Sequence, residues 1–399
     1  MQHSKTNKVL IFSFTYFPFI GGAEVALKEI TARIKDIQFD IITARLDKKL
    51  AKEETAGNVN IYRVGKGNKL DKIFYPIRAF LFAIKLHKKN NYPLIWAMMA
   101  NWAGMAALLF KLTHRKVNPH TKDFGVGVKY LLTLQSGDSD FFLWLRTWFW
   151  YPFYRMVYTK ADHIQVISGW LEKRARRYGY KGDISVVPNG VSLKMQETIN
   201  REQGDSFKNK LNISENSKII LTASRLVKKN DIKSLIKSIH LLITHYSLPI
   251  TLLIAGSGKL ETRLKNLTKN LKIEGNVIFL GNVKHNQVFK YYSIADVFVR
   301  PSLSEGMGIS FIEAMAAGVP IIGTRVGGIP DFLEDKKTGL FCKVKDPQDL
   351  AEKIKLLLED ESLYREIRDN GLKLTEKYDW DLIGESMRKI IDNLIVHNS

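Results

Sequence analysis

The sequence is poor in cysteine and in acidic side chains. Cys342 is the single cysteine in 399 residues, so no disulfide can form within the chain and a small disulfide-stabilised scaffold is excluded. Asp and Glu number 40 against 61 Lys and Arg, which gives a net charge of +21. With 45% hydrophobic and 25% charged residues, the composition is that of a globular protein of two or three domains, not of a disordered chain.

The excess of positive charge lies mostly in the first half. Residues 1–200 hold 31 basic and 15 acidic side chains, whereas residues 201–399 hold 30 and 25. Such a field attracts an anionic partner: a nucleic acid, a phosphorylated substrate or the acidic face of a membrane. No nucleic-acid motif is present and the basic residues are spread along the chain, so we expect no nucleic-acid partner and keep one only as a less favoured alternative.

Long apolar runs are also few. Residues 93–110 carry no charge, but they are rich in Ala, Met and Gly, and we expect a strand over 94–98 and a helix through 112 rather than a membrane span. The aromatic stretch 141–158 is interrupted by Arg and Pro. It fits either a core helix or an amphipathic segment at a membrane interface. The N-terminus indicates a buried first strand rather than a secretory signal.

Short apolar runs alternate with helical patterns along the whole chain. Expected strands include 9–14, 39–43, 131–134 and 163–167, and after a polar linker 218–223, 250–255, 277–280, 297–300 and 320–324. This alternation predicts parallel sheets with helices on both faces. We therefore expect two doubly wound α/β domains, 1–195 and 205–378, followed by a terminal helical segment, 379–399. Ligands of such sheets bind at the carboxyl ends of the strands, so a cleft between the domains is the expected site.

Two glycine turns could approach a ligand closely. Gly21 and Gly22 follow the first strand and begin a helix, where backbone N–H groups form an anion site. Gly256 and Gly258 follow a strand of the second half in the same way. Neither turn is the Gly-x-Gly-x-x-Gly fingerprint, which disfavours a nicotinamide cofactor.

Cations and carboxylates follow other strands of the second half. Arg225, Lys228 and Lys229 come just after a strand and suit a diphosphate, although a solvated basic loop is an equal alternative. Glu305 lies in a glycine-rich loop, and Glu313 lies about one turn into the helix that begins near Ile309. Carboxylates beside a helix N-terminus suit a ligand that carries both hydroxyls and phosphate.

The segment EGMGISFIEAMAAGVPIIGTRVGGIPD, with two glutamates separated by seven residues, resembles the retaining glycosyltransferases of family 4, which have the GT-B fold. Supporting matches are GGAE at 21–24, VVPNGV at 186–191, SRLV at 224–227, AGSG at 255–258 and YDW at 378–380. The resemblance covers nearly the whole chain. It implies two Rossmann-like domains facing across a cleft, with the last helix crossing back to the first domain.

By this resemblance the C-terminal domain binds a nucleotide sugar and the N-terminal domain binds the acceptor. Glu313 would hold the ribose hydroxyls, Glu305 the transferred sugar, and Arg225 with Lys229 the diphosphate; Arg225, Lys229 and Glu305 are the implied catalytic residues. The full expected donor-binding set is Gly21, Gly22, Gly256, Val283, Gly306, Met307, Gly308, Ile309 and Glu313. The family needs no metal ion, so the donor as co-substrate is the only small molecule implied besides the acceptor.

Two positions depart from the family pattern. The usual lysine five residues after the arginine is Asn230 here, and Lys229 is our substitute. A histidine near the acceptor is replaced by Gln135, which cannot accept a proton at neutral pH, and Asp138 lies close by. Without a histidine base, we expect front-face transfer in which the departing diphosphate takes the proton of the acceptor.

The expected function is therefore retaining hexosyl transfer to a lipid-linked or membrane-proximal glycan acceptor, for a cell-surface polysaccharide. The expected location is cytoplasmic, peripheral on an anionic inner face of the plasma membrane. A non-catalytic nucleotide-sugar-binding protein is the alternative that Asn230 and Gln135 leave open. A sugar-nucleotide epimerase or a phosphorylase is less favoured, because the glutamate spacing and the lysine environments do not match.

Overall fold

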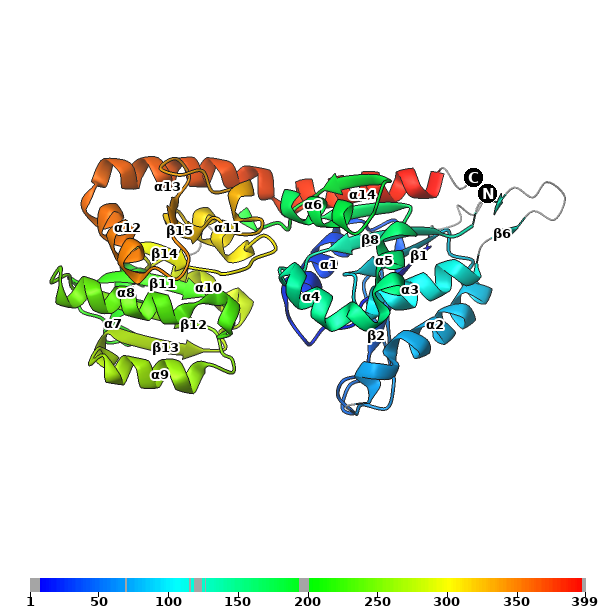
Figure 1. Cartoon of the computed structure of the whole chain (residues 1–399), viewed down its shortest axis with the longest axis horizontal. Coiled ribbons are helices and arrows are strands. Elements are labelled where there is room, and N and C mark those ends of the chain that lie inside the picture. Colours follow the sequence, from blue (N-terminus) through cyan, green and yellow to red (C-terminus); the bar gives the residue numbers. More distant parts are fainter. Residues whose placement is uncertain are drawn as a thin grey trace. The chain divides into compact units, whose positions relative to one another are not determined.

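The structure is a computed structural model that describes residues 8–68, 70–114, 116–117, 124–125, 127–193 and 201–396. Its contacts divide the chain into two compact units (Figure 1). The first unit contains residues 1–189 together with 380–399, and the second contains residues 190–379. Each unit is built around one parallel sheet, as the alternation of strands and helices predicts.

The first sheet has eight strands in the order β10-β9-β8-β5-β1-β2-β4-β3, all parallel except β3. Its central strands are buried on both faces, which explains their nearly continuous apolar sequences. The strands are β1 (Lys8–Phe12), β2 (Gln38–Ala44), β3 (Glu53–Ala56), β4 (Val59–Val64), β5 (Leu94–Met98), β8 (Lys129–Leu134), β9 (His163–Val166) and β10 (Asp183–Val186). A separate antiparallel pair joins β6 (Lys116–Val117) to β7 (Phe124–Gly125).

Helices cover this sheet (Figure 1). They are α1 (Gly22–Arg33), α2 (Asp71–Asn90), α3 (Trp102–Thr113), α4 (Asp140–Thr147), α5 (Tyr151–Thr159), α6 (Gly169–Arg177) and, from the end of the chain, α14 (Trp380–Val396). The apolar run 93–110 is thus a strand and a helix, as expected: β5 ends at Met98, and the side chain of Asn101 accepts the backbone N–H of Ala103 at 2.8 Å to begin α3. In the part of the chain that the structure describes, no helix is long and apolar enough to cross a bilayer.

The aromatic stretch 141–158 is partly buried and partly exposed. It forms α4, a 3₁₀ turn over Trp148–Trp150, and α5. Tyr154 and Tyr158 are buried, whereas Trp148 and Phe149 are 62% and 84% exposed. The segment therefore supplies both core residues and an apolar surface.

The C-terminal helix α14 packs on the first unit, which confirms the expected return of the chain. Trp380, Met387 and Ile391 are buried in one core with β1, β2, β5 and α1. At the helix surface Arg33 pairs with Asp381 at 2.6 Å. The return of α14 thus ties residues more than 340 positions apart into one folding unit.

The second sheet has six parallel strands in the order β13-β12-β11-β14-β15-β16. They are β11 (Lys218–Ala223), β12 (Ile250–Ala255), β13 (Val277–Gly281), β14 (Val297–Arg300), β15 (Ile321–Thr324) and β16 (Leu340–Cys342). The helices are α7 (Arg201–Lys210), α8 (Ile232–Thr244), α9 (Glu261–Asn270), α10 (His285–Tyr292), α11 (Ile309–Ala316), α12 (Pro347–Glu359) and α13 (Glu361–Thr375). Short 3₁₀ turns cover Lys228–Asn230, Glu274–Asn276, Ile329–Asp331 and Glu376–Tyr378.

Removing one buried side chain of α14 tests its role in the first unit. Met387 is fully buried, so Met387→Ala should lower the free energy of unfolding by about 3 kcal/mol through lost burial and a cavity. Leu382 on the same helix is half exposed, and Leu382→Ala should change it by less than about 0.5 kcal/mol. Urea denaturation followed by circular dichroism compares the two. Equal effects would contradict the packing of α14 on this core.

Candidate active site

In the second unit, the loops after β11 and β12 are in backbone contact. Gly256 has a φ of +137°, and a Cβ there would lie 1.9 Å from the carbonyl oxygen of Ser224, so only glycine fits. The N–H of Leu226 donates to the carbonyl oxygen of Ser257 at 3.0 Å. The SRLV and AGSG segments therefore form one surface at the carboxyl edge of the sheet.

The loops after β14 and β15 meet in the same way. Gly327 has a φ of +58°, and a Cβ there would lie 1.7 Å from the carbonyl oxygen of Glu305. The N–H of Leu303 donates to the carbonyl oxygen of Lys229 at 2.7 Å, which joins this pair of loops to the β11 loop. The glycine-rich glutamate segment and the basic loop are thus held together by main-chain contacts.

Glu305 is held by two donors. Its Oε1 accepts the backbone N–H of Gly306 at 3.0 Å, and its Oε2 pairs with the guanidinium of Arg300, the last residue of β14. Arg300 also donates to Ser310 Oγ at 3.0 Å and to Asn230 Oδ1 at 3.2 Å. Asn230 in turn donates to the carbonyl oxygen of Arg225 at 2.6 Å.

Glu313 is buried on α11 beside Tyr292 of α10. The Tyr292 hydroxyl lies 3.0 Å from Glu313 Oε2 and 3.2 Å from the carbonyl oxygen of Ser310. Burial, followed by the nearby Glu313 charge, raises the pKa of Tyr292 well above its ordinary value of 10. Tyr292 therefore keeps its proton at neutral pH and serves as a hydrogen-bond donor to the carboxylate.

The other predicted donor residues of the second unit also follow its strands. Met307 is buried, and Gly308 stands in the left-handed region immediately before α11, which begins at Ile309. The side chain of Arg225 is exposed and that of Lys229 is half-buried. Val283 comes two residues after Gly281, whose carbonyl oxygen accepts the N–H of Gly256 at 2.7 Å.

Two predicted residues of the first unit, Gln135 and Gly22, lie beside Asn189 of the VVPNGV segment. Asn189 is buried, and its Nδ2 donates to Gln135 Oε1 at 3.2 Å. The same Nδ2 would lie 3.9 Å from a Cβ at Gly22. Gly21 and Gly22, both exposed, begin α1, where the N–H of Val25 donates to the carbonyl oxygen of Gly21 at 3.1 Å. Gln135 is thus oriented by an amide partner.

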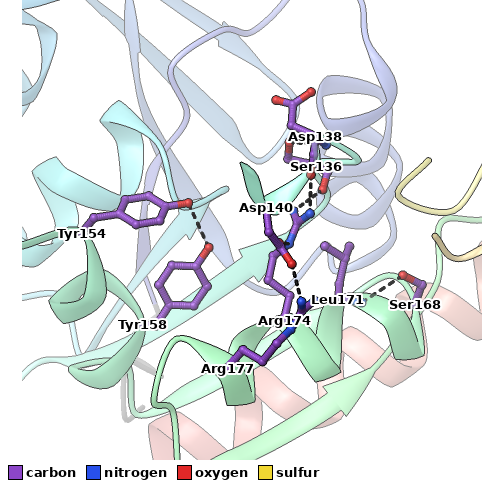
Figure 2. A network of polar contacts seen from close by, with 9 residues as sticks. All are labelled: Ser136, Asp138, Asp140, Tyr154, Tyr158, Ser168, Leu171, Arg174 and Arg177. Atoms are coloured by element: carbon purple, nitrogen blue, oxygen red, sulfur yellow. Dashed lines mark hydrogen bonds and ion pairs between the residues drawn. The ribbon is translucent and has the colours of Figure 1, made fainter. Parts of the chain in front are cut away.

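The loop that follows Gln135 is organised by one buried arginine (Figure 2). Arg174 of α6 donates to the carbonyl oxygen of Ser136 at 2.8 Å, to that of Asp138, and to Asp140 Oδ1 at 2.8 Å. Its guanidinium carbon also lies 4.1 Å from the ring centre of Trp170. The carboxylate of Asp138 points away from Arg174 (Figure 2). Arg174 therefore fixes the main chain of this loop.

Four supporting residues were not predicted: Tyr292, Arg300, Arg174 and Asn189. Asn189 belongs to a motif that the sequence does offer, but its contact with Gln135 spans 54 positions. The others carry no local pattern. As to metals, within the residues that the structure describes there is no cluster of three His, Cys, Asp or Glu side chains that could bind one.

Two family models cover most of the chain. The model "Glycosyltransferase Family 4" matches residues 20–194, and "Glycosyl transferases group 1" matches residues 204–374. The uncharacterized glycosyltransferase MJ1607 of Methanocaldococcus jannaschii is 31% identical over 393 residues, which cover 95% of this chain and 96% of that protein. The chain belongs to the group 1 glycosyltransferases.

Two further comparisons place this glycosyltransferase among relatives. A GDP-mannose-dependent monoacylated alpha-(1-6)-phosphatidylinositol monomannoside mannosyltransferase of Corynebacterium glutamicum is 29% identical over 248 residues, 60% of this chain and 64% of that protein. Sucrose-phosphate synthase from Thermosynechococcus elongatus superposes with a TM-score of 0.82 at 21% identity, over 98% of this chain and 100% of that one. The predicted GT-B fold, with its two parallel-sheet α/β units, is confirmed.

The glycosyltransferase offers two arginines on the same carboxylate for a matched test. Asp140 pairs with buried Arg174 and with Arg177, whose side chain is 57% exposed. Arg174→Ala leaves two carbonyl oxygens and one oxygen of Asp140 without their donor. It should therefore lower the free energy of unfolding by about 3 kcal/mol. Arg177→Ala should cost less than about 1 kcal/mol. Urea denaturation measures both, and equal losses would contradict the organising role of Arg174.

Proposed function

We propose that this protein is a retaining, metal-independent hexosyltransferase that moves a sugar from a nucleotide-sugar donor to a lipid-linked or membrane-proximal glycan acceptor, in cell-surface polysaccharide biosynthesis. The observation that carries the proposal is the pair of carboxylates at the carboxyl edge of the second sheet. Glu305 accepts a hydrogen bond from Arg300, and Glu313 accepts one from Tyr292. Oriented carboxylates accept hydrogen bonds from sugar hydroxyls strongly and directionally.

In the proposed donor complex Glu313 accepts the ribose hydroxyls and Glu305 accepts hydroxyls of the transferred sugar. The diphosphate lies at the amino end of α11, where Met307 to Ile309 present backbone N–H groups. Val283 contacts the base of the nucleotide. The turns at Gly256 and at Gly21–Gly22 complete the proposed donor-binding residues. The GDP-mannose dependence named for the Corynebacterium relative supports a nucleotide sugar as donor.

The proposed reaction breaks the bond between the anomeric carbon and the diphosphate oxygen and forms a bond to the acceptor oxygen on the same face. Arg225, Lys229 and the α11 amino end stabilise the negative charge that develops on the leaving diphosphate. The side chain of Gln135 has no basic nitrogen that could take the acceptor proton. The proton therefore passes to the departing diphosphate, which is the strongest base produced in the step.

The acceptor half of the proposal rests on an apolar stripe of α2 that faces solvent. Helices of water-soluble domains usually expose a polar face, but α2 exposes large apolar side chains at helical spacing. The stripe consists of Leu70, Ile73, Phe74, Ile77 and Leu81, which are between 45% and 61% exposed. Exposed Lys72, Lys85, Lys88 and Lys89 lie on the same helix. An apolar stripe with adjacent lysines suits an anionic membrane surface.

An open pocket of about 460 Å³ adjoins this stripe. It lies between α2 and the β3–β4 hairpin, and Leu81 of the stripe is one of its lining residues. Its cationic lining residues are Lys52, Arg63, Arg78 and Lys85; Arg63 is paired with Glu54 and Arg78 with Asp71, and Glu53 also lines the pocket. A phosphate of a lipid-linked acceptor or of an anionic lipid fits such a lining. These features support a peripheral location on the inner face of the plasma membrane.

A nucleotide panel tests the donor site. Differential scanning fluorimetry with UDP, GDP, ADP and dTDP, each alone and as its common sugar conjugate, should give a shift on the order of 3 °C for one base at saturating ligand. Glu313→Ala should abolish the shift. Tyr292→Phe should reduce it less, because the carboxylate stays in place and loses only its donor.

No shift with any nucleotide, on folded protein, would contradict the donor assignment. A shift that Glu313→Ala leaves unchanged would move the nucleotide away from α11. Binding without release of nucleoside diphosphate in the presence of acceptor lipid extracts would favour the non-catalytic alternative, for which Asn230 and Gln135 are the motivating departures. In the transferase case, Arg225→Ala should lower turnover at least tenfold, through loss of leaving-group stabilisation.

Liposome flotation tests the membrane claim. The protein should float with phosphatidylglycerol-containing vesicles at low salt and less at high salt, because the attraction to anionic lipid is screened. Vesicles of phosphatidylcholine alone should bind little of the protein. Ile73→Ser with Ile77→Ser should weaken binding severalfold through lost apolar insertion.

The matched control is Leu382→Ser, which removes an apolar side chain that is 50% exposed on α14. It should leave flotation unchanged. If the protein binds neither kind of vesicle, the membrane claim is wrong; if both variants weaken binding equally, α2 is not the contact surface.

A further inference from the structure

Arg300 connects three segments of the proposed donor site with one side chain. It ends β14 between the basic loop and the glutamate loop, and its side chain is 12% exposed. Its guanidinium contacts Asn230 of the basic loop, Glu305 of the glutamate loop and Ser310 in the first turn of α11. A planar, forked cation is the side chain best suited to hold several acceptors in fixed directions.

Glu305 is the anion that balances the buried guanidinium of Arg300. Its Nε group is buried with no hydrogen-bond partner. Asn230 and Ser310 supply neutral oxygens, and Glu305 supplies the carboxylate. A cation removed from water in this way is costly unless an anion balances it, so the pairing with Glu305 is expected to persist.

We propose that Arg300 is a positioning residue that aims the Glu305 carboxylate at the transferred sugar, with Asn230 as its second support. The inference rests on the proposed function, which gives Glu305 the sugar hydroxyls. It concerns a different residue and a different part of the ligand from the tests above.

The geometry leaves the carboxylate able to bind while it is held. Gly306 N–H fixes Oε1 and Arg300 fixes Oε2, and each carboxylate oxygen can accept more than one hydrogen bond. Sugar hydroxyls can therefore bind without displacing Arg300. The lone pairs that remain have fixed directions, because both oxygens are already anchored.

Asn230 completes the arrangement. It accepts from Arg300 with Oδ1 and donates to the Arg225 carbonyl oxygen with Nδ2, so it connects the guanidinium to the main chain of the basic loop. It is also buried, with 2% of its surface exposed. A lysine at position 230 would bring a second cation against Arg300, so the amide there is compatible with Arg300 where an ammonium is not.

Calorimetric titration of the full chain tests the proposal. The ligands are the nucleoside diphosphate that raises the melting temperature of the wild type and the sugar conjugate of that diphosphate. Probes are drawn from UDP and UDP-glucose, GDP and GDP-mannose, ADP and ADP-glucose, and dTDP and dTDP-glucose. In the Arg300→Met variant, affinity for the sugar conjugate should fall about tenfold while affinity for the diphosphate alone stays within about twofold. Arg300→Lys should show the same selective loss to a smaller degree, because an ammonium keeps the charge but lacks the rigid planar fork that directs the guanidinium to its acceptors.

A double-mutant cycle with Glu305→Gln adds a readout that a general structural role would not produce. If Arg300 acts through Glu305, the Arg300→Met, Glu305→Gln double variant should lose no more sugar-conjugate affinity than the more affected single variant. Arg368→Met is the matched control: Arg368 is an exposed arginine of the same unit paired with Asp369, and its loss should change neither affinity.

The possible failures are distinguishable. If no nucleoside diphosphate binds the wild type, the proposed function fails. If the diphosphate binds and Arg300→Met weakens both ligands equally, Arg300 holds the diphosphate or the fold rather than Glu305, and the inference is wrong. Full additivity with Glu305→Gln, or an unchanged sugar-conjugate affinity, overturns it as well. Should Arg300→Met fail to fold, Arg300→Lys and its cycle with Glu305→Gln give the same decision.

Discussion

The candidate donor site depends on main-chain contact between neighbouring loops of the second sheet. At Gly256 and at Gly327, a Cβ would lie 1.9 Å and 1.7 Å from the carbonyl oxygens of Ser224 and Glu305. Loops that touch through their backbones cannot slide past each other without breaking main-chain hydrogen bonds such as Leu303 to Lys229. The side chains that project from them are therefore held by the packing of the loops, before any ligand is present.

Two carboxylates of the second unit, Glu305 and Glu313, contact partners of different charge. Glu305 faces the guanidinium of Arg300, whereas Glu313 faces the neutral hydroxyl of Tyr292, whose pKa is raised by burial and by the carboxylate itself. A paired carboxylate repels a neighbouring anion less than an unpaired one does. In the proposed complex this places the balanced carboxylate at the sugar, next to the leaving diphosphate.

The fold was largely predictable, because strands buried on both faces require apolar runs and the helices between them have an amphipathic period. The strands β11, β12 and β14 begin and end where the sequence predicts them. The hairpin of β3 and β4 was missed, since β3 has the sequence EETA and is exposed throughout. Tyr292 was also missed, because its role arises from a contact 21 positions away that has no local pattern.

The two units differ in how far the sequence can reveal their ligands. In the second unit the close approaches require glycine, and a hydroxyl-rich ligand requires the carboxylates, so residue identity reports the chemistry. In the first unit Arg174 holds the 136–140 loop largely through the carbonyl oxygens of Ser136 and Asp138, which every residue type would supply (Figure 2). The Asp138 carboxylate points away from Arg174 (Figure 2). The contacts that fix this main chain therefore do not depend on which residues occupy positions 136 and 138.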